Sequence, residues 1–346
     1  MADPPRADVE PPMSAADTTS APKLGPSAPA RLRSAAAETK FRRAAGWVLA
    51  FTLFVILFGA VVRITGSGAG CGQHWPTCHG EVAHLPKTLE TLIELTHRIT
   101  SGLSAFFVLG LAVAALRLYG RGHAVLRATL VASFFMLVEA LIGAMLVRLE
   151  LVGSNASTAR AIVMPLHLVS TSILTGALAV AFWWARPPAA TASHPVLEPA
   201  ARKSALRLLA FGLAGLLIVS GFGALTALGD TLYPVPASGI SERLRGITGS
   251  HSLERLRVLH PVLAVLLAVF LLASVPRLRD PLYPLAARKL AGATCLLVGA
   301  QMLAGGINVL LSAPGWMQVL HLLLACLLWL SMVVLVLEIW APRTIT

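Results

Sequence analysis

The chain has 346 residues, of which 56% are hydrophobic and only 13% are charged. That composition leaves too little polar surface to cover a water-soluble globule of this length, so it predicts an integral membrane protein. The formal net charge of +12 is largely accounted for by the charge pattern that sets membrane topology, and we therefore expect no nucleic-acid partner.

Eight apolar runs are each long enough to cross the hydrocarbon of a bilayer, which is roughly 30 Å thick and takes about 20 helical residues. In lipid every backbone amide must be paired within its own segment, so runs of this length predict helices rather than barrel strands. The expected fold is all-α, with eight transmembrane helices in two four-helix-bundle repeats. The runs are residues 45–62, 99–118, 125–147, 162–185, 206–228, 258–275, 290–311 and 317–339.

Residues 1–44 are rich in Ala, Pro, Ser and Arg without apolar periodicity, which predicts a disordered cytoplasmic tail. Of the 28 Lys and Arg residues, 19 fall on the side of the N-terminus when sides are counted alternately. This bias predicts that both termini are cytoplasmic and that the protein lies in the cytoplasmic (inner) membrane. The expected organisation is an N-terminal half at 45–186, a cytoplasmic linker at 187–205, a C-terminal half at 206–340 and a cytoplasmic tail at 341–346.

The first outer loop contains the stretch CGQHWPTCHG, in which Cys71 and Cys78 stand beside His74 and His79. Covalent attachment of a c-type haem needs two residues between the cysteines, and this stretch has six, so that kind of site is excluded. The compartment outside a bacterial-type cytoplasmic membrane is oxidising, which favours a structural disulfide between Cys71 and Cys78. A redox-active disulfide ranks second. A zinc or copper site ranks third, because the spacing matches no standard metal motif.

A histidine lies at the start of each even-numbered run, at the outer end. The separations of these histidines, 70 residues in the first half and 61 in the second, are similar enough to indicate a duplicated four-span module. The text FGAVVRITGSG at the end of the first run is echoed by GFGALTALGD at the end of the fifth. The four histidines are His97, His167, His260 and His321.

Two histidines in each apolar half suit haem iron, which takes axial ligands from facing helices in an apolar bundle. Zinc would need three or four ligands with carboxylate or thiolate help, and neither pair is accompanied by such a set. We therefore expect two haem sites toward the outer face. The candidate cations for the haem propionates at that rim are Arg98, Arg160, Arg255 and Arg257.

Glu94 lies three residues before His97, on the same helix face if the helix extends that far. The corresponding positions before the other histidines hold Met164, Arg257 and Gln318. Only the first half therefore places a carboxylate beside its histidine, where it can accept a proton or stabilise a cation at a porphyrin edge. An ordinary helix-start Glu, favoured by the helix dipole, explains this residue almost as well.

Other polar or reactive side chains lie within the runs. Glu139 is an acid inside the third run, where a charge is costly without a partner. We expect it to pair structurally, with Arg148 as the candidate, rather than to act in catalysis. Cys295 and Cys326 fall in mid-span and are expected to serve as small apolar residues.

The stretch GSGAGCGQHWPTCHG after the first run, ELTHR at the start of the second, and one histidine on each even run of two four-span halves resemble the haem A synthase family. The resemblance covers about residues 45–340. It implies an enzyme that oxidises the C8 methyl of haem O to the formyl group of haem A by successive hydroxylations. One departure is that some members carry a second cysteine pair in the outer loop of the C-terminal half, whereas residues 229–257 contain none.

The resemblance also implies a division of labour between the halves. The N-terminal half is expected to hold the substrate haem O, and the C-terminal half a haem b that passes electrons. The half with the acid would then be the reactive one. The implied roles are axial contacts to the substrate haem for His97 and His167, ligation of haem b iron for His260 and His321, catalysis for Glu94, and the loop disulfide for Cys71 and Cys78.

Two other classes of protein remain open on the sequence. A di-haem b-type membrane electron carrier that oxidises quinol would use the same paired histidines, but it does not explain why one half alone bears Glu94. A haem exporter or chaperone would bind porphyrin without altering it. For the enzyme, the expected partners are membrane lipid, haem O, the haem O synthase, and a quinol or other electron donor.

Overall fold

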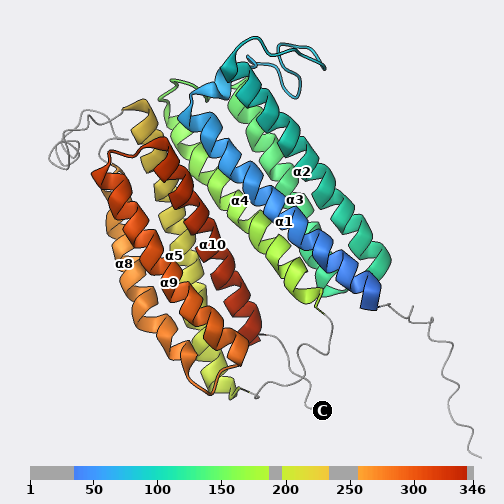
Figure 1. The fold of residues 1–346 in the computed structure, drawn as a ribbon, viewed down its shortest axis with the longest axis vertical. Helices are drawn as coiled ribbons and strands as arrows, with labels where there is room; N and C mark the ends of the chain where they lie inside the picture. Colours follow the sequence, from blue (N-terminus) through green and yellow to red (C-terminus); the bar gives the residue numbers. More distant parts are fainter. Residues whose placement is uncertain (1–34, 187–196, 234–255, 341–346) are drawn as a thin grey trace, which may run out of the picture. The chain divides into compact units, whose positions relative to one another are not determined.

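The computed structural model describes residues 35–186, 197–233 and 256–340 (Figure 1). Over these ranges it contains eight helices that are long and apolar enough to cross a membrane, and no β-strand, only one isolated bridge between Cys78 and Glu81. The predicted all-α fold class is therefore confirmed. The tail predicted to be disordered covered residues 1–44, but residues 35–44 are helical, and residues 199–205 of the predicted linker are helical as well. The tail and linker residues 1–34, 187–196 and 341–346 lie outside the described residues.

The helix boundaries follow the apolar runs and extend beyond several of them. The first two helices begin ten residues before the corresponding runs, because good helix formers continue each helix into polar sequence. Thr88 caps the second of them, accepting the Thr91 N–H at 3.2 Å. The helices are α1 (Ala35–Ile64), α2 (Leu89–Tyr119), α3 (Ala124–Arg148), α4 (Thr158–Trp184), α5 (Pro199–Leu232), α8 (Leu259–Ser274, continued by the short helix η4, Val275–Arg279), α9 (Leu285–Leu310) and α10 (Gly315–Trp340).

The helices form two groups of four, coloured blue to green and yellow to red in Figure 1. In the first group α1 contacts α2, α2 contacts α3, α3 contacts α4, and α4 returns to α1. In the second group α5, α8, α9 and α10 make the same cycle of contacts. Each group buries its own apolar cluster, built around Val108, Leu174 and Leu178 in the first and around Leu271, Met332 and Leu335 in the second.

The two groups contact each other through α4 with α5, α4 with α10, and α1 with α10. A small apolar cluster of Ala179, Trp183, Val333 and Leu337 fills the contact between α4 and α10. Polar side chains also join the two groups of helices at two places. Arg63 of α1 donates to the Ala227 carbonyl at 2.8 Å, to the Thr231 hydroxyl at 2.6 Å and to the Gln318 side chain at 2.7 Å. Glu338 of α10 accepts from Trp183 Nε1 at 2.8 Å and from Arg186 at 2.6 Å.

Many large apolar side chains point outward from the helices. Phe106 is 79% exposed and Leu296 is 77% exposed, although both lie in the middle of long apolar helices. Exposed apolar surface on this scale is not found on a soluble monomer and is what lipid covers. The chain is a multi-pass membrane protein.

Candidate functional site

The loop between α1 and α2 is closed by a disulfide between Cys71 and Cys78, as predicted. Both sulfur atoms are therefore bonded to each other, and a metal site that used the two thiolates is incompatible with this arrangement. Cys71 and Cys78 are also among the most buried residues of the chain, with 0% and 1% of their surface exposed. The disulfide thus forms the interior of the loop.

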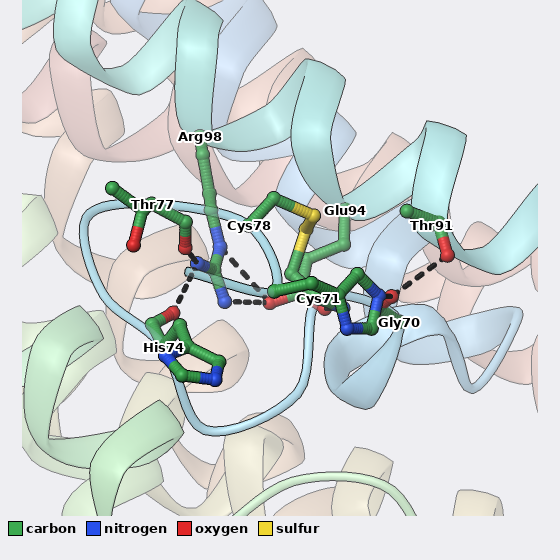
Figure 2. Close-up of polar contacts among 9 residues, drawn as sticks. Gly70, Cys71, His74, Thr77, Cys78, Thr91, Glu94 and Arg98 are labelled. Atoms are coloured by element: carbon green, nitrogen blue, oxygen red, sulfur yellow. Dashed lines mark hydrogen bonds and ion pairs between the residues drawn. A yellow bond between two sulfur atoms is a disulfide. The ribbon is translucent and has the colours of Figure 1, made fainter. Parts of the chain in front are cut away.

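Glu94 fixes this loop to α2 (Figure 2). The side chain is 3% exposed, and its Oε2 accepts the Cys71 N–H at 2.7 Å. Its Oε1 accepts from Arg98 Nε at 3.0 Å and is also paired with Arg98 Nη2. One turn earlier, the Thr91 hydroxyl donates to the Gly70 carbonyl at 2.7 Å. The carboxylate is buried but fully compensated, and it faces the disulfide.

The described arginines that we considered as propionate contacts each bind backbone carbonyls. Arg98 donates to the carbonyls of His74 and Thr77, at 2.5 and 2.6 Å. Arg160 is 4% exposed and donates from Nη1 to the Gly153 and Asn155 carbonyls, at 2.7 and 2.9 Å. These two arginines therefore order the loops next to the histidines, while the Nε of Arg160 has no hydrogen-bond partner among the described residues.

Arg257 and Arg255 complete the set of candidate cations. Arg257 donates to the Gly229 carbonyl at 2.6 Å, and its Nε lies 3.4 Å from the Asp230 carboxylate. It thereby ties the start of α8 to the end of α5. Arg255 lies outside the described residues.

The first histidine pair comes from α2 and α4. His97 lies eight residues after the start of α2, with its ring 6.1 Å from that of Phe58 on α1. Its Nδ1 is buried without a hydrogen-bond partner in the described part of the chain. His167 lies on α4, and α1 contacts both α2 and α4. Nδ1 of His167 is 2.9 Å from the Oε2 of Glu139 on α3.

The second pair comes from α8 and α10. The ring centroids of His260 and His321 are 6.3 Å apart, and the ring planes are nearly perpendicular, at 86°. His260 Nδ1 donates to the Val219 carbonyl at 3.0 Å. The Nε2 atoms of His321 and Gln301 are 3.1 Å apart, and His321 Nδ1 is buried without a partner over the described ranges.

Glycines on the neighbouring helices receive three of these four imidazole rings. A Cβ added to Gly59 would lie 3.1 Å from Cε1 of His97, one at Gly223 would lie 3.0 Å from Cε1 of His260, and one at Gly305 would lie 3.1 Å from Cε1 of His321. Only a residue without a side chain permits so close an approach. Buried imidazole nitrogens without partners and glycine-lined rings fit a ligand that binds between paired histidines, as haem iron does.

The contact between His167 and Glu139 was not predicted from the sequence, and the pairing of Glu139 with Arg148 was wrong. Arg148 instead reaches the Trp75 carbonyl at 3.4 Å, across the loop. Arg148 is the last residue of α3, whereas Glu139 lies nine residues earlier, so the two are separated by more than two helical turns. A second polar residue, Gln301, stands equally nine residues before the end of α9.

The fold and these sites describe a multi-pass helical membrane protein. Each of its two four-helix groups carries a histidine pair, and a disulfide closes the loop between α1 and α2. A comparison with protein families identifies the family within this class of membrane proteins. The chain belongs to the COX15-CtaA family, described as cytochrome oxidase assembly protein, whose sequence profile matches residues 42–333. The resemblance to the haem A synthase family is thereby confirmed.

Curated relatives match the chain over different lengths. The chain is 47% identical over 292 residues to a protohaem IX farnesyltransferase of Thermus thermophilus, a match that covers 83% of this chain and 46% of the relative. It is 46% identical over 91 residues to haem A synthase of Staphylococcus haemolyticus, and 39% identical over 92 residues to haem A synthase of Bacillus cereus. These matches cover 26% and 27% of this chain and 30% of each relative. The chain thus spans about half the length of its Thermus relative.

Proposed function

We propose that the protein is a haem A synthase that oxidises the C8 methyl of haem O to a formyl group by successive hydroxylations. Family membership and the names of the staphylococcal and bacillar relatives support this reaction. The observation that carries it is the single acid next to a histidine: Glu94 lies one turn before His97, and no other histidine of the two pairs has a carboxylate at that position.

We assign the substrate haem O to His97 and His167, and a resident haem b to His260 and His321. When bound, haem would supply the redox chemistry, and the histidines would hold it in a dry setting and a fixed orientation. The long apolar helices around each pair keep water away, which strengthens any charge interaction with the substrate. Arg160 has a buried Nε without a hydrogen-bond partner in the described ranges, so it is our first candidate for a propionate contact.

Glu94 would act electrostatically. Its pairing with Arg98 and the Cys71 N–H offsets the cost of burying the carboxylate. A negative charge held one turn from His97 favours positive charge that develops on the substrate near that histidine. The same contacts give Glu94 a second task, holding the disulfide loop, and an experiment has to separate the two.

The remaining assignments follow from the topology. We propose that both termini are cytoplasmic, that the histidine pairs lie toward the outer face of the inner membrane, and that haem b passes electrons from a quinol or other donor. The name of the Thermus relative, a farnesyltransferase acting on protohaem IX, supports a functional neighbourhood with the haem O synthase. Haem O, that synthase and membrane lipid are the proposed partners.

The test uses purified full-length protein and chromatography of its extracted pigment. The wild type should contain haem b together with haem O, a hydroxylated intermediate or haem A. Glu94→Gln keeps an acceptor for the Cys71 N–H and Glu94→Ala does not, so both should retain haem b but make no haem A. Glu90→Ala, at an exposed position in the first turn of α2, is the matched control and should remain active.

Each alternative has its own outcome. If the Glu94→Gln variant makes haem A, Glu94 holds the loop in place and takes no part in the reaction. Haem b alone in the wild-type protein would indicate an electron carrier. Reversible binding of unaltered porphyrin would indicate an exporter or chaperone.

A further inference from the structure

The carboxylate of Glu139 on α3 is held by three side chains of α4. Its Oε2 lies 2.9 Å from His167 Nδ1 and accepts from the Thr171 hydroxyl at 2.7 Å. Its Oε1 accepts from the Ser170 hydroxyl. The carboxylate is 13% exposed, so it needs these donors to remain in an apolar bundle.

The second group of helices has an amide at the equivalent position. Helices α3 and α9 end in the same way: the capping amides of Leu149 and Leu311 bond to carbonyls four and two residues earlier, and the next residue has a positive φ. Counting ten residues back from each cap gives Glu139 in α3 and Gln301 in α9. Each contacts the histidine of the following helix, although at different ring nitrogens: Glu139 meets Nδ1 of His167, and Gln301 meets Nε2 of His321.

The hydroxyls that support the acid are also confined to the first group. Ser170 and Thr171 lie three and four residues after His167. Three and four residues after His321 the chain has Leu324 and Ala325, which offer no donor. The first group of helices therefore has the acid and both of its donors, and the second group has none of the three. This is expected if the first histidine pair requires a negative charge beside it.

We propose that Glu139 is a positioning residue for the first histidine pair. With its Oε2 2.9 Å from Nδ1 of His167, the carboxylate favours a proton on that nitrogen and would leave Nε2 to hold iron, and its charge would make Nε2 a stronger donor. Gln301 is neutral and has no such effect on His321. The two sites therefore differ in electronic character: the first stabilises ferric haem more strongly than the second. The inference rests on the proposed assignment of both pairs to haem.

The experiment uses the full-length protein in detergent, stripped of pigment and reloaded with ferric haem b as the probe. Haem affinity, the reduction potentials and the low-spin electron paramagnetic resonance signals are measured. A His321→Ala background isolates the first site, and a His167→Ala background isolates the second. In the first background, Glu139→Gln should weaken ferric haem binding by about 10- to 100-fold and raise the potential.

Gln301→Glu in the second background is the matched exchange and should lower the potential of the second site. Thr171→Val keeps the carboxylate but removes a donor to the same Oε2, which leaves that oxygen a stronger acceptor for His167, so it should lower the potential of the first site slightly. If Glu139→Gln does not fold, the reduction potentials of Thr171→Val and Gln301→Glu are sufficient to test the inference.

An unchanged potential and an unchanged resonance signal in these variants would overturn the inference. Equal shifts at both sites after substitution of Glu139 would also overturn it, because that result means a general loss of structure. The outcome is independent of the reaction: a protein that makes no haem A can still show the shift at His167, and an active haem A synthase can fail to show it.

Discussion

Replacing Cys71 and Cys78 together by Ser is expected to loosen the loop between α1 and α2 while leaving the helices in place. The disulfide closes a ring of eight residues. In the chain-entropy description, a cross-link over eight residues restricts the open state by about 2.5 kcal/mol at 25 °C. Since about 1.4 kcal/mol corresponds to a factor of ten, opening of the loop should become roughly 60-fold more frequent.

The effect should stay within the loop, because other contacts continue to hold its ends. The Cys71 backbone N–H donates to Glu94, and Arg98 binds the His74 and Thr77 carbonyls, and none of these contacts uses sulfur. The double substitution should therefore raise the population of an open loop without separating the loop from α2 in the closed state.

Amide hydrogen exchange followed by mass spectrometry measures this directly. Peptides from residues 70–85 should exchange roughly 60-fold faster in the double Ser variant, and peptides from the centre of α2 should be unchanged. Cys295→Ser, which alters a free cysteine on α9, is the control and should leave the loop unaffected. An exchange rate in the loop within about threefold of wild type would refute the reasoning, because the other contacts would then suffice to close it.

Two further predictions concern the second group of helices and its contact with the first. Gly223→Ala forces a methyl to 3.0 Å from the His260 ring, an overpacking cost of about 1–3 kcal/mol, and should reduce the haem b content of purified protein about tenfold. Gly221→Ala is the control: its Cβ would meet its nearest neighbour at 3.8 Å, so this variant should retain haem b. Pyridine haemochrome spectra measure both variants, and equal haem contents would contradict the clash. Arg63→Gln removes the charged donor between the two groups of helices and should lower the free energy of unfolding by about 3 kcal/mol. Its thermal unfolding temperature should therefore lie below that of the exposed control Arg43→Gln. Equal unfolding temperatures would show that the contact between the groups does not depend on Arg63.

The fold was predictable because lipid imposes a simple rule on the sequence. Apolar runs of about 20 residues leave only the helix as a solution, so all eight spans were found. Their starts were less accurate: α1 begins at Ala35 and α2 at Leu89, since the polar turns at their ends carry no hydropathy signal. As a result His97 lies more than two turns inside α2 rather than close to its end.

The disulfide was predictable from two cysteines in one loop and an oxidising compartment. The contacts of the charged residues were not. Arg98 was considered for a propionate, yet it binds two loop carbonyls and Glu94, because a buried guanidinium takes the nearest acceptors that the fold offers. Glu139 was paired with Arg148 on the strength of charge alone, although its partners come from α4. Contacts of this kind depend on the rotation of one helix against another, which spacing along a single helix does not encode.

The contacts between the two groups of helices bear on how one group can influence the other. Gln318 and Glu338 on α10 are 20 residues apart, which is about 30 Å along a helix and matches the hydrocarbon thickness of a bilayer. The polar contacts with Arg63 and with Trp183 therefore lie near the two ends of α10, where polar groups are least costly, and apolar packing fills the length between them. Because His321 follows Gln318 by three residues, the Arg63 contact lies one turn from the second histidine pair. Loss of Arg63 should thus disturb haem b retention, whereas loss of Glu338, about five turns away, should lower stability and leave that haem in place.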